Sequence, residues 1–262
     1  MKRVNLPVRS VLIVSALLII VGLWALPQIF QRPPLAVQIP MPTRTEESYH
    51  PVLQLVQGGT TVDTGLTVWE EYFVFTPDCK SLYYSRGEEP SAAIGRYDVA
   101  TGNVFRYDLP SLGSGTLYLP QISPDGRKIA WFNTHDMARG VVVMDIVPSV
   151  GAPHFVYDNR NAANVSDFRW DRNSQHIAVE FDLGSSQPYL HVRMDMNGQA
   201  QEITAAEWET YLGYTYTPSA DSATRQFELM SPTGLFRVTG TMGDYGATQV
   251  SAECFPQYPL KK

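Results

Sequence analysis

Six aspartates at recurring positions are the first candidates for chemistry in this chain of 262 residues. Three begin apolar alternating stretches and three end later ones: Asp78, Asp125, Asp171, Asp98, Asp145 and Asp195. Carboxylates in such numbers could bind calcium or share proton transfer. Their recurrence at equal positions favours one turn-stabilising role repeated several times, because an aspartate side chain accepts hydrogen bonds from the backbone just downstream.

Five histidines complete the candidate set: His50, His135, His154, His176 and His191. No two have the spacing of metal ligands and none lies near a cysteine, so we predict no metal site. The sequence also lacks a Gly-rich phosphate loop, a His-Glu-x-x-His motif and a Cys-x-x-Cys pair. We therefore predict no cofactor and no catalytic residues, and we expect that the chain is not an enzyme.

The elements that position these aspartates repeat along the chain. Residues 75–85, 122–132 and 168–179 align, with 47 residues from Asp78 to Asp125 and 46 from Asp125 to Asp171. Proline sets φ for the first corner of a turn, and glycine relaxes its exit. The repeat-turn residues are Pro77, Asp78, Pro124, Asp125, Gly126 and Asp171, with Trp170 in place of a third proline. A degraded fourth copy is expected to begin at residues 216–219.

Each copy continues in the same way. After the turn come an alternating strand, a polar loop, a second strand, a Gly-containing turn and a third strand such as residues 104–108 or 154–157. Several strands in a period of about 40 to 50 residues are typical of a β-propeller blade. We predict an all-β fold, a small β-propeller of about four degenerate blades, each an antiparallel meander, following one N-terminal transmembrane helix.

The best copy, Ser-Pro-Asp-Gly-x-x-Ile-Ala-Trp at residues 123–131, resembles the TolB-like, Pro-Asp type of propeller repeat. The Tyr-Asp-x-x-Thr-Gly element at residues 97–102 resembles it too. The resemblance covers residues 68–204 well and residues 205–256 poorly. It implies a β-propeller whose loops at one end bind a ligand or partner.

The N-terminal residues indicate that the protein is anchored in a membrane. Residues 1–10 carry three basic side chains, and residues 11–30 carry no charge, which suits one helix across roughly 30 Å of hydrocarbon. A cleaved signal peptide is the rival interpretation. We expect a basic cytoplasmic tail at 1–10, a signal-anchor helix at 11–30, a Pro-rich linker at 31–48 and an extracytoplasmic domain at 49–262. The protein would then be a single-pass protein of the cell membrane.

Whether the two cysteines can form a disulfide depends on whether the ring of blades closes. Residues 51–68 contain strand-like pieces that could supply the outer strand of the last blade. Closure would bring Cys79 and Cys254 within reach of each other, so we favour a disulfide over two separate thiols. An open stack of sheets, or a partial ring completed by a second molecule, is the alternative.

Charge and aromatic content bear on the partner. Without its first 32 residues the chain has 16 basic against 26 acidic side chains, a balance that repels a phosphate backbone and argues against nucleic acid. Trp208, Tyr211 and Tyr214 lie outside the clean repeat and form the candidate binding loop. We expect a protein-binding scaffold or accessory subunit of an envelope complex. A small-ligand or glycan sensor using the central channel is the alternative, and a hydrolase with a loop-built site is a third hypothesis.

Overall fold

The computed structural model of the chain describes residues 36–39, 51–67, 73–86, 92–113, 117–133, 140–147, 149–158, 164–184, 188–218, 225–243 and 246–256. The expected cytoplasmic tail, signal-anchor helix and most of the linker lie outside these residues. Within the described ranges, each helix is too short or too polar to cross a membrane.

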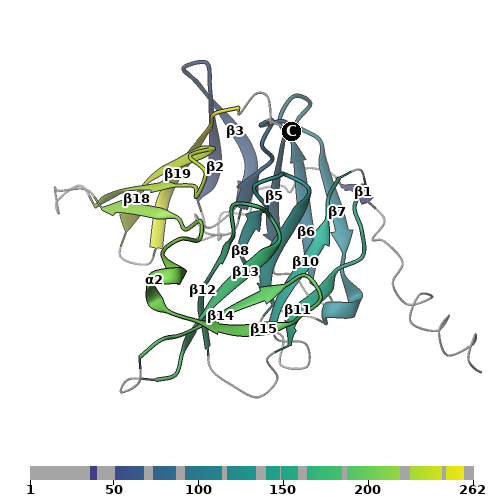
Figure 1. The fold of residues 1–262 in the computed structure, drawn as a ribbon. Coiled ribbons are helices and arrows are strands. Elements are labelled where there is room, and N and C mark those ends of the chain that lie inside the picture. The colour runs from purple at the N-terminus through teal and green to yellow at the C-terminus, as the bar shows by residue number, and fades with distance from the viewer. Residues whose placement is uncertain are drawn as a thin grey trace, which may run out of the picture. The chain divides into compact units, whose positions relative to one another are not determined.

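The described chain is all-β, and its sheets are antiparallel meanders, with one parallel pairing in the last sheet, consistent with a β-propeller (Figure 1). We call the sheets blades 1 to 4. Blade 1 contains β4 (Phe73–Phe75), β5 (Ser81–Arg86), β6 (Ala93–Asp98) and β7 (Val104–Asp108), with β1 (Ala36–Ile39) at its outer edge. Blade 2 contains β8 (Leu117–Ile122), β9 (Lys128–Asn133), β10 (Gly140–Asp145) and β11 (His154–Asp158). Blade 3 contains β12 (Asn164–Trp170), β13 (His176–Asp182), β14 (Leu190–Asp195) and β15 (Ala200–Ile203).

Blade 4 is built from both ends of the described chain. It contains β16 (Thr215–Pro218), β17 (Gln226–Met230), β18 (Phe236–Gly243), β19 (Gly246–Cys254), β2 (Val52–Gln57) and β3 (Thr60–Thr67), in that order. Strand β19 pairs in parallel with β2, for example Ala252 with Leu55. Figure 1 shows the early strands β2 and β3 beside the late strand β19. Residues 51–68 therefore do supply outer strands to the last blade.

Two short helices lie in the connections between blades: a 3₁₀ turn at Pro110–Leu112 and α2 at Ala205–Trp208. Strand β1 lies inside the segment that we expected to be a linker. It pairs with β7 only at the edge of blade 1, where a proline-rich flank does not remove a hydrogen bond from the sheet interior.

Strand alternation divides the core between blades. In β10, Val142 and Met144 belong to an apolar cluster shared with blades 1 and 4, whereas Val141 and Val143 belong to a second cluster shared with blade 3. Successive side chains point to opposite faces of a strand, so one sheet packs against two neighbours. This explains why β9 and β10 are apolar at nearly every position rather than at every second one.

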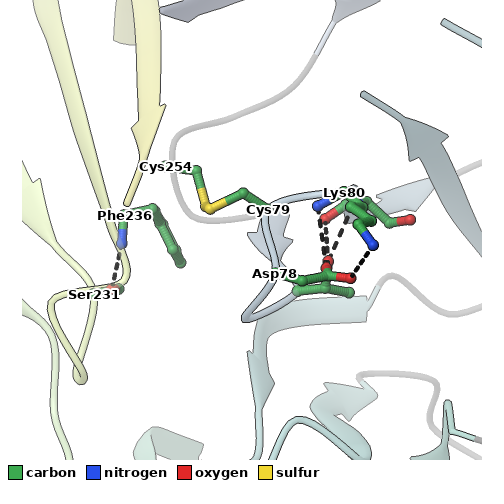
Figure 2. Close-up of a disulfide and its surroundings, with 8 residues drawn as sticks. Asp78, Cys79, Lys80, Ser231, Phe236 and Cys254 are labelled. Atoms are coloured by element: carbon green, nitrogen blue, oxygen red, sulfur yellow. Dashed lines mark hydrogen bonds and ion pairs between the residues drawn. A yellow bond between two sulfur atoms is a disulfide. The ribbon is translucent and has the colours of Figure 1, made fainter. Parts of the chain in front are cut away.

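Blades 1 and 4 are joined covalently and by aromatic packing. Cys79, just after β4, forms a disulfide with Cys254, the last residue of β19 (Figure 2). The ring of Phe236 packs at 5.4 Å from that of Phe75 and 6.2 Å from that of Phe73, measured between centroids. The cysteine pairing favoured from the sequence is thus formed, and it links residues 175 positions apart.

We predict that replacing both cysteines with alanine lowers the free energy of unfolding by about 2–5 kcal/mol, because the bridge restricts a long loop in the unfolded chain. Urea denaturation of the full-length chain measures this. Cys79 has φ +56°, so a C79G/C254A variant should recover about 1 kcal/mol of the loss relative to C79A/C254A. Identical unfolding curves with and without reductant would contradict the prediction.

Candidate functional site

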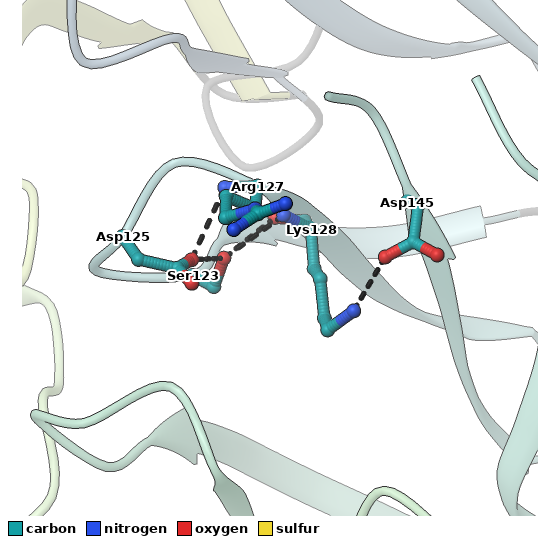
Figure 3. Close-up of polar contacts among 5 residues, drawn as sticks. All are labelled: Ser123, Asp125, Arg127, Lys128 and Asp145. Atoms are coloured by element: carbon teal, nitrogen blue, oxygen red, sulfur yellow. Dashed lines mark hydrogen bonds and ion pairs between the residues drawn. The ribbon is translucent and has the colours of Figure 1, made fainter. Parts of the chain in front are cut away.

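The repeat turns close each blade at the same end and form the framework of the candidate site. In turn 2 (residues 123–128) the Ser123 hydroxyl accepts a hydrogen bond from the Lys128 N–H at 2.9 Å and donates to Asp125 Oδ1 at 2.6 Å. Asp125 Oδ1 also accepts from the Arg127 N–H at 3.1 Å (Figure 3). The carboxylate therefore stabilises the turn itself, because it accepts a hydrogen bond from a backbone N–H that has no partner in the sheet.

Turn 1 (residues 76–81) repeats this network with a threonine. The Thr76 hydroxyl donates to Asp78 Oδ1 at 2.7 Å and accepts from the Ser81 N–H at 3.1 Å. Asp78 Oδ1 accepts from the Lys80 N–H at 3.1 Å. The second aspartate series behaves similarly: Asp98 accepts from the Thr101 hydroxyl and N–H, and the Thr101 hydroxyl contributes most to lowering the pKa of Asp98 below its usual value.

Turn 3 (residues 171–176) corrects the sequence alignment. The Asp171 N–H donates to the His176 carbonyl, and the Ser174 N–H donates to the Asp171 carbonyl. Ser123 occupies this position in turn 2, so Asp171 corresponds to Ser123 and not to Asp125. Its carboxylate accepts from the backbone N–H groups of Gln175 (2.8 Å) and His176 (3.1 Å). Asp171 alone thus accepts the two backbone hydrogen bonds that Ser123 and Asp125 share in turn 2.

Turn 4 lies at residues 231–236 rather than at residues 216–219. The Ser231 hydroxyl accepts from the Phe236 N–H at 2.9 Å, and the Gly234 N–H donates to the Ser231 carbonyl at 2.8 Å. Pro218 instead ends β16 and pairs with Phe227. Strand β16 is an additional inner strand beside β17. Its insertion stretches the interval between turns 3 and 4 to 60 residues, compared with 48 between turns 2 and 3.

In turns 1 to 3 the fourth residue faces the preceding blade. Cys79 in turn 1 bonds to Cys254 of blade 4, and a Cβ added to Gly126 in turn 2 would lie 2.7 Å from Pro77 Cγ in turn 1. In turn 3 the Ser174 hydroxyl accepts from the Asp125 N–H of turn 2 at 3.0 Å. All four positions have φ between +56° and +71°. Gly234 in turn 4 breaks the series, since within the described chain a Cβ there would meet no atom within 4 Å.

The segment between α2 and β16 contacts blades 2, 3 and 4. The Leu212 N–H donates to the Trp170 carbonyl of blade 3 at 2.9 Å. The Tyr214 hydroxyl donates to the Pro120 carbonyl of blade 2 at 3.4 Å, and its ring packs 6.2 Å from that of Phe236 in blade 4. These contacts replace direct sheet-to-sheet packing with an inserted segment.

A small pocket remains where these inner strands meet. Its volume is about 30 Å³, and residues of all four blades line it, among them Pro77, Pro124, Trp170, Tyr214 and Pro232. This volume holds a water-sized group or two. Two buried polar atoms of lining residues, Gln121 Oε1 and Trp170 Nε1, have no hydrogen-bond partner within the described part of the chain. The pocket can therefore accept only a very small polar group.

The three aromatic residues of the predicted binding loop fall in two places. Trp208 is 2% exposed, stacks on His191 at 4.9 Å and lies 4.3 Å from the Arg169 guanidinium. Helix α2 holds it there through a capping box in which the Thr204 and Glu207 side chains bond each other's backbone N–H. Trp208 and the partly buried Tyr211 therefore cover blade 3, whereas Tyr214 lines the central pocket.

The two blade 3 side chains that contact Trp208, His191 and Arg169, each pair with a carboxylate. His191 Nε2 lies 2.9 Å from Glu180 Oε2, and Arg169 Nε lies 3.0 Å from Asp167 Oδ2. Burial raises the pKa of Asp167, and the Arg169 ion pair opposes that rise. The described residues nevertheless contain no cluster of three or more His, Cys, Asp or Glu side chains that could hold a metal ion.

Two larger cavities lie at the same turn-bearing end. One, of about 390 Å³, lies beside the Cys79–Cys254 bridge between blades 1 and 4. The other, of about 420 Å³, lies between turn 2, turn 3 and the loop after β10, and contains the Lys128–Asp145 ion pair (Figure 3). Both have the size of a small-molecule or side-chain site. Sequence reasoning missed them because their walls come from segments far apart in the chain.

Comparison with known proteins gives structural likeness only. No family model matches the sequence, and no curated protein matches it. A TolB chain from Agrobacterium tumefaciens is 21% identical, with 55% of this chain and 52% of that chain covered and a TM-score of 0.40. TolB from Acinetobacter baumannii is 16% identical, with 74% and 49% covered and a TM-score of 0.40. The chain spans about half the length of these two TolB chains.

One expectation is corrected by the same comparison. The absence of a catalytic motif led us to expect no enzyme, but hydrolases are among the similar structures. Pseudomonas aeruginosa periplasmic gluconolactonase is 16% identical, with 72% of this chain and 58% of that chain covered and a TM-score of 0.37. Peptidases and an isopeptidase also match. The expectation is withdrawn, because scattered loop residues can build a site without a motif. At these identities the similarity assigns no reaction to the chain.

We predict that G126A destabilises the protein by about 1–3 kcal/mol more than G234A. Both glycines have left-handed φ values, so alanine costs about 1–2 kcal/mol of backbone strain at each. Only at Gly126 would the new methyl also collide with Pro77. Urea denaturation of the two full-length variants provides the comparison. Equal losses would show that turns 1 and 2 do not press on each other.

We predict that stability falls above pH 10, partly through Tyr214. Burial raises the pKa of Tyr214, so the folded chain retains a proton that the unfolded chain loses above about pH 10. Each such tyrosine lowers the free energy of unfolding by about 1.4 kcal/mol per pH unit in that window. Tyr214→Phe should flatten the slope by one proton, whereas Tyr189→Phe, which removes an exposed hydroxyl, serves as the matched control. Parallel slopes for wild type and Y214F would refute the assignment.

Proposed function

We propose that the chain is a membrane-anchored, extracytoplasmic β-propeller that binds another protein through the turn-bearing end of its blades, as a scaffold or accessory subunit of an envelope complex. One observation carries the proposal. The cavities of about 390 and 420 Å³ lie between neighbouring blades at this end, where a protein surface can reach both, while the centre offers only about 30 Å³.

The central pocket disfavours the ligand-sensor alternative. Small-molecule sites usually enclose about 300–1,000 Å³, which is roughly ten to thirty times the volume of about 30 Å³ left between Tyr214, Phe236 and Trp170. A metabolite or sugar in the channel would first have to displace the segment that holds blades 2, 3 and 4 together. Binding at the turn-bearing end requires no such rearrangement.

The proposed location draws on the sequence and on the disulfide. Residues 11–30 are uncharged, and the basic residues that precede them favour an N-terminus on the cytoplasmic side. The Cys79–Cys254 bridge suits an oxidising compartment, which is where the domain beyond such an anchor would lie.

A matched pair of surface variants tests the binding end. Val147 is 48% exposed and lines the cavity of about 420 Å³, whereas Leu183 is 40% exposed and follows β13 at the opposite end of the blades. Val147→Glu and Leu183→Glu introduce the same charge in place of an exposed apolar side chain. We expect the tagged full-length chain to recover a stoichiometric partner from crosslinked membranes, and V147E to recover at least about tenfold less.

Two results would overturn the proposal. One is the absence of any stoichiometric partner with the wild-type chain. The other is a loss with L183E that equals or exceeds the loss with V147E, because it would move the contact to the opposite end of the blades. Circular dichroism of both variants checks that the fold is retained.

A further inference from the structure

The cavity of about 390 Å³ beside the disulfide, which we call the disulfide cavity, has an apolar floor. Leu55 of β2, Phe75 of β4 and Ala252 of β19 line it and are at most 2% exposed. The Cys79–Cys254 bridge and Val99 form further apolar lining. A cavity of this size and composition suits a group with a hydrocarbon portion.

The charged side chains of this cavity have one sign. Among the described residues, its lining contains Asp78 and Glu253 but neither lysine nor arginine. Glu253 Oε2 is bound by Arg237 at 2.7 Å, so its charge is largely balanced. Asp78 Oδ1 is used within turn 1, while Asp78 Oδ2 has a 3.8 Å contact with Lys80 Nζ (Figure 2). That ion pair is weak, because the two side chains are 44% and 72% exposed.

The cavity of about 420 Å³ is lined by charges of both signs. Arg127 and Lys128 line it together with Asp125 and Asp145, so positive and negative groups are balanced. Its lysine is already paired with Asp145. The disulfide cavity therefore stands apart in combining an apolar floor with carboxylates alone.

We propose that the disulfide cavity binds a lysine or arginine side chain of the protein partner. The hydrocarbon stem would lie on the floor formed by Leu55, Phe75 and Ala252, and the cationic head would meet Asp78 Oδ2 in exchange for the exposed Lys80. Long basic side chains commonly bury their stems in this way while a carboxylate holds the charge. The assignment rests on the proposed protein-binding function, and the acidic balance of the chain beyond residue 32 agrees with it.

Short peptides test the proposal directly on the full-length chain. The probe is Ac-Ala-Lys-Ala-NH₂, and Ac-Ala-Nle-Ala-NH₂ is its neutral isostere. We expect NMR titration to shift the backbone amides of Gly58, Val99 and Ala252, with about threefold to tenfold tighter binding of the lysine peptide. Raising the salt concentration from about 0.05 M to about 1 M should bring the two affinities together, because salt screens the charge contact.

Two aspartates in equivalent turns provide the matched variants. Asp78→Asn should bring the affinity for the lysine peptide down to that of the norleucine peptide. Asp171→Asn makes the same change in turn 3, where the carboxylate also accepts backbone hydrogen bonds but lines neither of the two large cavities, and it should leave the affinity unchanged. Thermal unfolding of both variants shows whether they remain folded at the titration temperature.

The outcomes separate this proposal from the one on which it rests. Equal affinities for the lysine and norleucine peptides, or equal losses in D78N and D171N, would overturn the cation site. If the membrane pull-down still recovered a partner, the binding function would stand without it. Conversely, selective lysine binding that D78N abolishes would establish the cation site whatever the pull-down recovered.

Discussion

The parallel pairing of β2 with β19 is the constraint on which the rest of the structure depends. It brings residues 52–57 and 250–254 into one sheet, although nearly two hundred positions separate them. Only because β19 ends beside turn 1 can Cys254 reach Cys79, and only because β2 lies alongside can Leu55 close the floor of the disulfide cavity. Pairing so distant in sequence is costly in chain entropy, which the covalent bridge reduces.

The sequence allowed the repeat to be predicted because its turns carry local chemistry. A Pro-Asp-Gly run between a polar and an alternating segment determines its own hydrogen bonds, as Ser123 and Asp125 show. The same reasoning misplaced turn 3, since Asp171 reproduces the network from the position of Ser123. Aligning on the residue type therefore displaced the copy by two positions. Turn 4 was missed because Thr233 stands in place of the aspartate and β16 interrupts the period.

The candidate site was less predictable than the fold, for a physical reason. Tyr214, Pro120 and Phe236 come together only when three blades are assembled, and no spacing in the sequence encodes that meeting. Aromatic content alone did not distinguish Trp208, which covers the Glu180–His191 pair, from Tyr214, which lines the centre. The cysteine pair was the exception, because the proposed closure of the last blade already implied proximity.

Turn 4 differs from the other three turns in how it connects its blade to the preceding one. At two junctions the fourth residue of a turn bonds to the blade before it, through a disulfide and through a hydroxyl. At a third junction, Gly126 approaches Pro77 so closely that a Cβ would not fit. At the junction of blades 3 and 4, Gly234 makes no such contact within the described chain, and the fastening passes instead through Leu212 and Tyr214. This junction therefore takes its contacts from an inserted segment, whereas the repeat turns themselves supply those at the other three.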